Sequence, residues 1–176
     1  MNSLEDIDID DYWSIIKYNY DQIRFAEIKA SAVISLYSIL LTLGYTLDVL
    51  DDENVYDFSF ESFEAMKLLS FIPAVYFTFQ SLRSCISCIL PRLNIVVEKS
   101  PLFFGDFNKY KDFDEYFSSL HAVFNNEENY KKHLSQSVYA TGKIAIIKFL
   151  NINRAIKSLL YSILSFIVFL ITLYIV

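Results

Sequence analysis

The sequence predicts an all-α membrane protein with three transmembrane helices and a small, mostly helical cytoplasmic unit between the second and the third. Three long segments are almost entirely apolar. Ala30 to Leu47 and Ser158 to Val176 contain no charged residue, and Leu68 to Leu90 contains one, Arg83. A helix needs about 20 mostly apolar residues to span a bilayer, and these segments are close to that length. Glycine and proline number three each, which is too few for a turn-rich β architecture.

At 176 residues we expect one structural unit rather than two domains. Six consecutive segments follow from the apolar pattern. They are 1–29 as a cytoplasmic amphipathic helix, 30–50 as the first transmembrane helix, 51–65 as an acidic periplasmic loop, 66–90 as the second transmembrane helix, 91–157 as a cytoplasmic region and 158–176 as the third transmembrane helix.

The charge distribution predicts which side of the membrane each segment faces. Residues 48–64 contain seven acidic residues and no basic one, whereas residues 92–157 contain ten of the fifteen lysines and arginines. Loops rich in Lys and Arg stay in the cytoplasm. We therefore expect the N-terminus and residues 91–157 inside and the acidic loop outside. Arg83 is then expected near the inner interface as an anchor, or alternatively as an inward ligand or gating contact.

Small polar residues recur at steps of three or four in each predicted span. In lipid, such residues let helices approach closely and form hydrogen bonds between them. The alternative is that a stripe lines water in an oligomeric pore. The residues are Ser31, Ser35, Ser38, Thr42 and Thr46 in the first span, Gln80, Ser81 and Ser84 in the second, and Ser158, Ser162, Ser165 and Thr172 in the third.

Helical periodicity also extends outside the apolar segments. Residues 9–29 are typical of an amphipathic helix that runs into the first span. Asp112 followed by Glu115 resembles a capping box that opens a helix ending near Phe124. A long helix is expected from Glu127 into the third span, with Gly142 inside it for close packing or a nearby ligand. The predicted contact face of the first of these helices consists of Trp13, Ile16, Tyr20, Ile23 and Ile28.

Aromatic residues are dense between positions 103 and 117. We expect them to form the small core that seats the cytoplasmic unit on the helices, and a base-stacking platform is the alternative. These residues are Phe103, Phe104, Phe107, Tyr110, Phe113, Tyr116 and Phe117.

Several classes of function are disfavoured. A net charge of −6 argues against a nucleic-acid partner. No phosphate loop, HExxH motif or nucleophile with a credible base is present, so we expect neither an enzyme nor a cofactor. Cys85 and Cys88 share a helix face but have no nearby histidine, which favours packing over metal binding. The acidic N-terminus is unlike a signal peptide.

Four fragments appear in an order that is typical of a known family. They are AEIKAS (26–31), PRLN (91–94), SPLFFGDF (100–107) and QSVYATGKIAIIKF (136–149), the last leading into a final apolar segment. The chain resembles the Pycsar transmembrane effector family of bacterial anti-phage defence, from about residue 25 to its end. The FFGD element between the second and final spans is the most specific part, and Glu27 is a mild departure from an expected Asp.

The resemblance implies an effector that is switched on by cyclic CMP or cyclic UMP, made by a partner pyrimidine cyclase during phage infection. Activation would impair the bacterial inner membrane, so that the infected cell stops growing before phage matures. Region 91–157 would then be the sensing region of a multi-pass, homo-oligomeric protein whose partners are the nucleotide and the lipid bilayer. The positions matched to the family are Lys29, Phe104, Gly105, Asp106, Gln136, Lys143 and Lys148.

Chemistry is compatible with a nucleotide site at these positions. Gly105 allows close approach of backbone, and Asp106 can accept a hydrogen bond from a ribose hydroxyl or base amino group. The alternatives are a tight turn with Asp106 capping a helix, and lysines that contact solvent or headgroups. Candidate phosphate-binding residues are Arg24, Lys29, Lys143 and Lys148, and candidate stacking residues are Phe103 and Phe104.

Two other functions remain open from the sequence. The first is a SLATT-type membrane effector that answers a different signal, which the apolar C-terminal segment disfavours because that type ends in a cytoplasmic helix. The second is a structural subunit of a membrane complex that binds no ligand.

Overall fold

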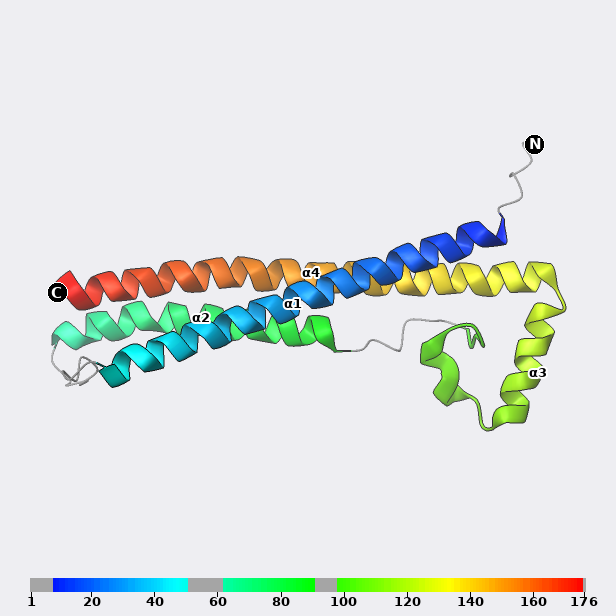
Figure 1. The fold of residues 1–176 in the computed structure, drawn as a ribbon, viewed down its shortest axis with the longest axis horizontal. Coiled ribbons are helices and arrows are strands. Elements are labelled where there is room, and N and C mark those ends of the chain that lie inside the picture. The colour runs from blue at the N-terminus through cyan, green and yellow to red at the C-terminus, as the bar shows by residue number, and fades with distance from the viewer. Residues whose placement is uncertain (1–7, 51–61, 91–97, 176) are drawn as a thin grey trace. The chain divides into compact units, whose positions relative to one another are not determined.

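The computed structural model describes residues 8–50, 62–90 and 98–175. It contains α1 (Ile9–Leu50), α2 (Ser62–Ile89), the 3-10 helix η1 (Phe104–Lys109), α3 (Phe113–Phe124) and α4 (Glu127–Ile175) (Figure 1). Helices hold 91% of the described residues, and none of these residues lies in a strand. The predicted all-α class is therefore confirmed.

The long helices begin and continue as the sequence predicts. α1 carries Asp10 and Asp11 in its first turn, where carboxylates interact favourably with the helix dipole. It then runs unbroken for 42 residues, so the amphipathic segment and the first apolar segment form one helix. α4 begins after Asn126, whose side-chain Oδ1 accepts a hydrogen bond from Asn129 N at 3.0 Å, and continues for 49 residues.

The predicted capping box opens α3. Asp112 is the N-cap residue, and its Oδ1 accepts a hydrogen bond from Glu115 N at 2.9 Å. The Glu115 carboxylate returns to the backbone N–H of Lys111 at 2.7 Å, one residue before the usual capping-box partner. α3 ends at Phe124 and the chain turns at Asn125, as expected.

The chain divides into two compact units, to both of which α1 and α4 contribute. The first unit comprises Met1–Ala26 and Leu90–Phe149, and the second comprises Glu27–Ile89 and Leu150–Val176. Most of the residues that the charge distribution assigns to the cytoplasm, 1–26 and 91–149, belong to the first unit, whereas 27–29 and 150–157 belong to the second. The apolar segments, apart from Leu90, also belong to the second unit.

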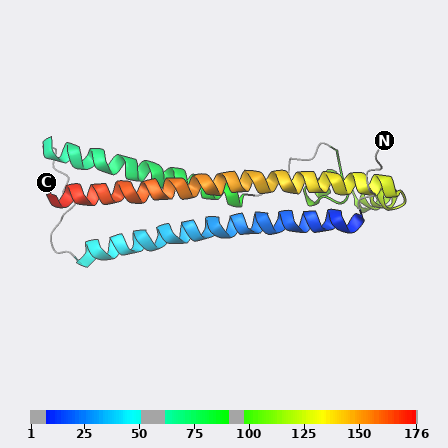
Figure 2. The same ribbon diagram turned by 90° about the horizontal axis from the view of Figure 1, so that it is seen from above.

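In the first unit, α1 and α4 lie side by side and run in the same direction (Figures 1 and 2). Trp13 Nε1 donates to Tyr130 Oη at 3.3 Å. Asn19 Nδ2 lies 3.0 Å from Thr141 Oγ1 and 3.2 Å from Val138 O. Thr141 is buried together with Leu134, so a polar contact and an apolar core occupy the same face of α4.

The predicted contact face of α1 is partly wrong. Trp13, Tyr20 and Ile28 are about half exposed, whereas Ile16 and Ala26 are buried. Two helices approach most closely where side chains are small, so the buried stripe of α1 combines Ala26 with Ile16 and leaves Tyr20 and Ile28 outside it. Large side chains outside this stripe then remain on the surface.

Gly142 has a packing role. A Cβ placed there would lie 3.4 Å from Asn19 Nδ2, so the glycine leaves room for the asparagine between the two helices. Close packing, one of the two explanations that the sequence leaves open, accounts for a residue that otherwise costs a helix about 1 kcal/mol relative to alanine.

In the second unit, α2 packs beside the C-terminal half of α4 (Figures 1 and 2). The hydroxyls of Thr78 and Ser162 are 2.6 Å apart, and Ser81 Oγ donates to Ala155 O at 2.8 Å. Ser81 and Ser162 are buried. Polar residues of the second and third predicted spans therefore join helices, as expected for close packing in lipid.

The hydroxyl stripe of α1 behaves differently, because its members are all exposed. Ser38, Thr42 and Thr46 each donate to the carbonyl four residues earlier in their own helix. A pore-lining role for this stripe stays a prediction.

Among the described residues, two helices are long and apolar enough to cross a membrane: α1 over Ile9–Thr46 and α4 over Glu127–Thr172. They include residues 30–46 of the first predicted span and 158–172 of the third. The described part of α2, which holds Pro73, Gln80 and Arg83, is not among them, so the second span stays a prediction. Of the predicted acidic loop at 51–65, residues 51–61 lie outside the described residues, and residues 62–65 belong to α2 and not to a loop.

The contact between Asn19 and Gly142 predicts opposite responses to a small and a large substitution. Gly142→Ala gains about 1 kcal/mol of helix propensity against a tight but tolerable contact, so we expect little change or a small gain in stability. Gly142→Leu displaces Asn19 and is expected to cost about 1–3 kcal/mol. Thermal unfolding of the detergent-purified variants measures both. Equal stability of the two variants would contradict the packing of α1 on α4.

Candidate functional site

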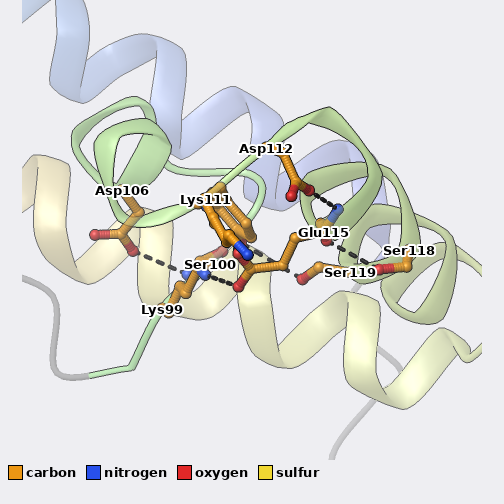
Figure 3. Close-up of polar contacts among 9 residues, drawn as sticks. Lys99, Ser100, Asp106, Lys111, Asp112, Glu115, Ser118 and Ser119 are labelled. Atoms are coloured by element: carbon orange, nitrogen blue, oxygen red, sulfur yellow. Dashed lines mark hydrogen bonds and ion pairs between the residues drawn. The ribbon is translucent and has the colours of Figure 1, made fainter.

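A chain of buried polar groups seats the loop between α2 and α3 on α4. Asp106 is fully buried, and its Oδ2 accepts a hydrogen bond from Ser100 N at 2.8 Å (Figure 3). The hydroxyl of Ser100 lies 3.0 Å from Nδ1 of His133 on α4. Ser100 and His133 are also buried. Buried polar groups are costly unless they are satisfied, so this chain fixes the position of the loop.

The local sequence explains the shape of this loop. Phe103 N donates to Ser100 O, and Asp106 N donates to Phe103 O, so two successive turns follow Ser100. The Asp106 side chain then reaches back to the Ser100 amide and closes them. Lys109 Nζ lies 2.6 Å from Asp106 Oδ1, although outside hydrogen-bond geometry, and its charge offsets that of the buried carboxylate.

The tight-turn alternative for the FFGD element is thus what the structure contains. Asp106 does not cap its own helix, because η1 has Phe103 as N-cap residue without a side-chain bond. Gly105 has no positive φ, nor does any other described residue.

A second polar group lies beside the first, nearer the surface. The Glu98 carboxylate Oε2 is 2.9 Å from Lys132 Nζ and accepts a hydrogen bond from Gln136 Nε2 at 3.2 Å. Gln136 Oε1 is buried and has no hydrogen-bond partner among the described residues. Lys132 and Gln136 are one turn apart on α4, so they face the same side of the helix.

The surroundings of His133 and Glu98 shift the pKa values of both side chains. Burial lowers the pKa of His133 below its ordinary value, with the nearby charge of Glu98 opposing this and that of Lys132 adding to it. The hydrogen bond and charge of Lys132 lower the pKa of Glu98. At neutral pH these shifts favour a neutral His133 imidazole next to a charged Glu98 carboxylate.

A surface network connects the same loop to α3. The ammonium of Lys99 pairs with the Glu115 carboxylate (Figure 3) and lies 3.8 Å above the ring of Tyr110. Because Glu115 also binds the Lys111 amide, one carboxylate on α3 holds both ends of the loop. The contact with Lys99 contributes to lowering the pKa of Glu115.

The expectation of an aromatic core is wrong for most of its members. Phe103 is buried, but Phe104 is 75% exposed and Phe107, Phe113 and Phe117 are also exposed. Rings contact one another along the surface, as in the stacked pair of Phe113 and Phe117. Within α3 only Val123 is buried. The helix is held to the loop by the polar contacts of Glu115 and by ring contacts of Tyr116 with Phe107 and Tyr110.

The predicted site residues are only partly brought together. Phe104, Gly105 and Asp106 lie in the loop, which also contributes Glu98, the partner of Gln136. Lys143 is exposed, with its Nζ 3.3 Å from Tyr139 Oη. Lys148 is buried, with its Nζ 3.5 Å from Leu90 O. Lys29 belongs to the second unit, and its role stays a prediction.

Sequence reasoning missed Glu98, Ser100, Lys132 and His133. The signals present were the spacing of Lys132, His133 and Gln136 on α4 and the placement of a histidine one turn before the small residue Ser137. No group of residues suited to hold a metal ion occurs in the part of the chain that the structure describes.

The fold and this loop define an all-helical, membrane-associated protein. We call the loop at 98–112, α3 and the N-terminal part of α4 that contacts the loop the polar unit. A family model for the Pycsar effector protein domain matches residues 11–176. The chain belongs to the Pycsar effector family, which makes it an effector of anti-phage defence. No curated protein and no solved structure matches it.

His133 predicts a pH dependence with a definite sign. Because its pKa is lowered in the folded state, the unfolded chain takes up a proton first as the pH falls below about 6.5. The contribution of His133 to stability is thus complete above that pH and is lost as the pH falls through the native pKa.

We expect the melting temperature of the wild type to fall between pH 7.5 and 5.5 by more than that of His133→Gln, which does not titrate. Glu98, the carboxylate that most affects His133, has a lowered pKa and so titrates below this window. Identical pH profiles for the two proteins would show that His133 is not buried in neutral form.

Proposed function

We propose that this effector is switched on by cyclic CMP or cyclic UMP from a partner pyrimidine cyclase, and that it then impairs the bacterial inner membrane. The carrying observation, beside family membership, is the continuity of α4. One helix holds His133 and Gln136 at the loop and extends without interruption through the apolar segment that is long enough to cross a bilayer.

The polar unit offers the groups that a cyclic nucleotide requires. Lys132, which is exposed on α4 one turn before Gln136, supplies positive charge for the phosphate, and the exposed Lys143 lies further along the same helix. Gln136 has a buried acceptor without a partner among the described residues, which suits a ribose hydroxyl or base amino group. Phe104 is exposed and available to stack on a base. Asp106 is less suited to contact ligand, because its carboxylate is buried and holds the turn.

Output requires a change in the membrane segments. A single chain has too few spans to enclose a water-filled conduit, so the active state is a homo-oligomer or a rearrangement that thins the bilayer. Ligand biases this change by binding the active state more tightly. The N-terminus and residues 91–157 face the cytoplasm in this proposal, where the cyclase product is made.

The test measures binding and membrane damage separately. Full-length protein is reconstituted in liposomes that contain a fluorescent dye, and is titrated with a panel of cyclic nucleotides. A variant with Gly-Gly inserted after Asn151 interrupts α4 and shifts its register. The control carries the same insertion after Asn126, in the turn before α4.

We expect the wild type and the control to bind one cyclic pyrimidine nucleotide and release dye. The Asn151 insertion is expected to bind the same nucleotide but to release no more dye than ligand-free protein. Binding of none of the nucleotides by the wild type would contradict the proposed signal. Release at the wild-type rate by the Asn151 insertion would show that the signal does not travel along α4.

A further inference from the structure

The carboxylate of Glu98 is bound in the way that a small anion would be. Its Oε2 forms an ion pair with Lys132 Nζ at 2.9 Å and accepts a hydrogen bond from Gln136 Nε2 at 3.2 Å. Both donors come from α4, whereas Glu98 is supplied by the loop. An ammonium and a neutral N–H donor one helical turn apart also form the minimal recognition pattern for a phosphate oxygen.

The Gln136 amide oxygen is incompletely satisfied: it meets the geometry of no hydrogen bond among the described residues, although a contact between the Gln136 and His133 side chains opposes the lowering of the His133 pKa by burial. This oxygen is buried, while Nε2 of the same amide is engaged by Glu98. A carboxylate offers acceptors only, so Glu98 cannot satisfy this oxygen. A ligand that carries both an anion and an N–H or O–H donor satisfies both halves of the amide.

The contact of Glu98 is suited to being exchanged. The side chains of Glu98 and Lys132 are 57% and 58% exposed, and ion pairs this open to solvent are weak and screened by salt. The loop does not depend on them, because the buried contacts of Ser100 with Asp106 and His133 hold it separately.

We propose that Glu98 is an internal occupant of an anion site formed by Lys132 and Gln136, and that the phosphate of a nucleoside cyclic monophosphate replaces it. This rests on the proposed function and adds a regulatory contact to it. One monoanion replaces another, so Lys132 keeps a counter-charge throughout. Glu98 thereby sets the threshold concentration of nucleotide at which the effector responds.

Replacement of Glu98 by an uncharged residue tests whether Glu98 occupies the anion site. Glu98→Gln keeps the size of the side chain but removes its charge. Glu127→Gln is the matched control, because Glu127 also pairs with a lysine of α4, Lys131 at 3.1 Å, without contacting Gln136. Isothermal titration of each full-length protein in detergent uses cyclic CMP, cyclic UMP and, as a probe without phosphate, cytidine.

We expect Glu98→Gln to bind the activating nucleotide up to about fivefold more tightly than the wild type, the gain that an exposed ion pair can oppose. Glu127→Gln should match the wild type. Cytidine should bind Glu98→Gln and wild type alike. Lys132→Gln should weaken nucleotide binding and reduce its dependence on salt, since the charge that attracts the phosphate is gone.

Different results would contradict the occupant role of Glu98 and the proposed function. Nucleotide binding by the wild type with equal affinity in Glu98→Gln and Glu127→Gln would overturn the occupant role and leave the proposed function intact. Failure of the wild type to bind any nucleotide would overturn the proposed function. Inorganic phosphate then decides the remaining question: tighter binding by Glu98→Gln than by Glu127→Gln supports the anion site, and equal binding rejects it.

Discussion

The hydrogen bond from the Ser100 amide to the buried Asp106 carboxylate is the contact on which the polar unit depends. It closes the turns of the loop and sets the Ser100 hydroxyl against His133 of α4. Once the loop is fixed there, Glu98, two residues before Ser100, is placed to meet Lys132 and Gln136. A buried carboxylate without its donor would be expensive, so the loop has one favourable way to lie on the helix.

Side chains of α4 also complete the end of α2. The last carbonyl groups of any helix lack partners within it. Asn151 Nδ2 donates to Ser87 O at 3.3 Å, and Lys148 Nζ lies 3.5 Å from Leu90 O. Lys148 is buried and engaged with a backbone carbonyl, which makes it less accessible to a phosphate than the exposed Lys143.

Local rules of sequence predicted the helices well and their packing less well. Caps at Asp112 and Asn126, and the lack of proline in α1 and α4, determine where helices begin and how far they run. The face through which α1 contacts α4 depends on which residues allow the two helices to approach closely. The small residues Ala26 and Gly142 lie in this contact, whereas Trp13 and Tyr20 are about half exposed. The aromatic residues near position 110 were wrongly predicted to form a core. A high local density of aromatic residues does not show whether their side chains point into the protein or toward solvent.

In the candidate site, too, the sequence indicated individual residues but not the partners that they contact. The family resemblance drew attention to Asp106 and Gln136, and both take part in the polar groups around the loop. Their partners Ser100, His133 and Glu98 were not found, because each is between six and 38 residues distant in sequence from the group that it contacts. Only the folded chain brings such residues within hydrogen-bonding distance.

Hydrogen exchange at the Ser100 amide tests the central contact most directly. Ser100 lies outside any helix, so slow exchange there can come only from a contact such as the one with Asp106. The account predicts strong protection of this amide in the wild-type protein, rapid exchange in Asp106→Ala, and protection unchanged in Asp114→Ala, which removes an exposed carboxylate of α3. Exchange in the wild type as fast as that of an open loop would contradict the account.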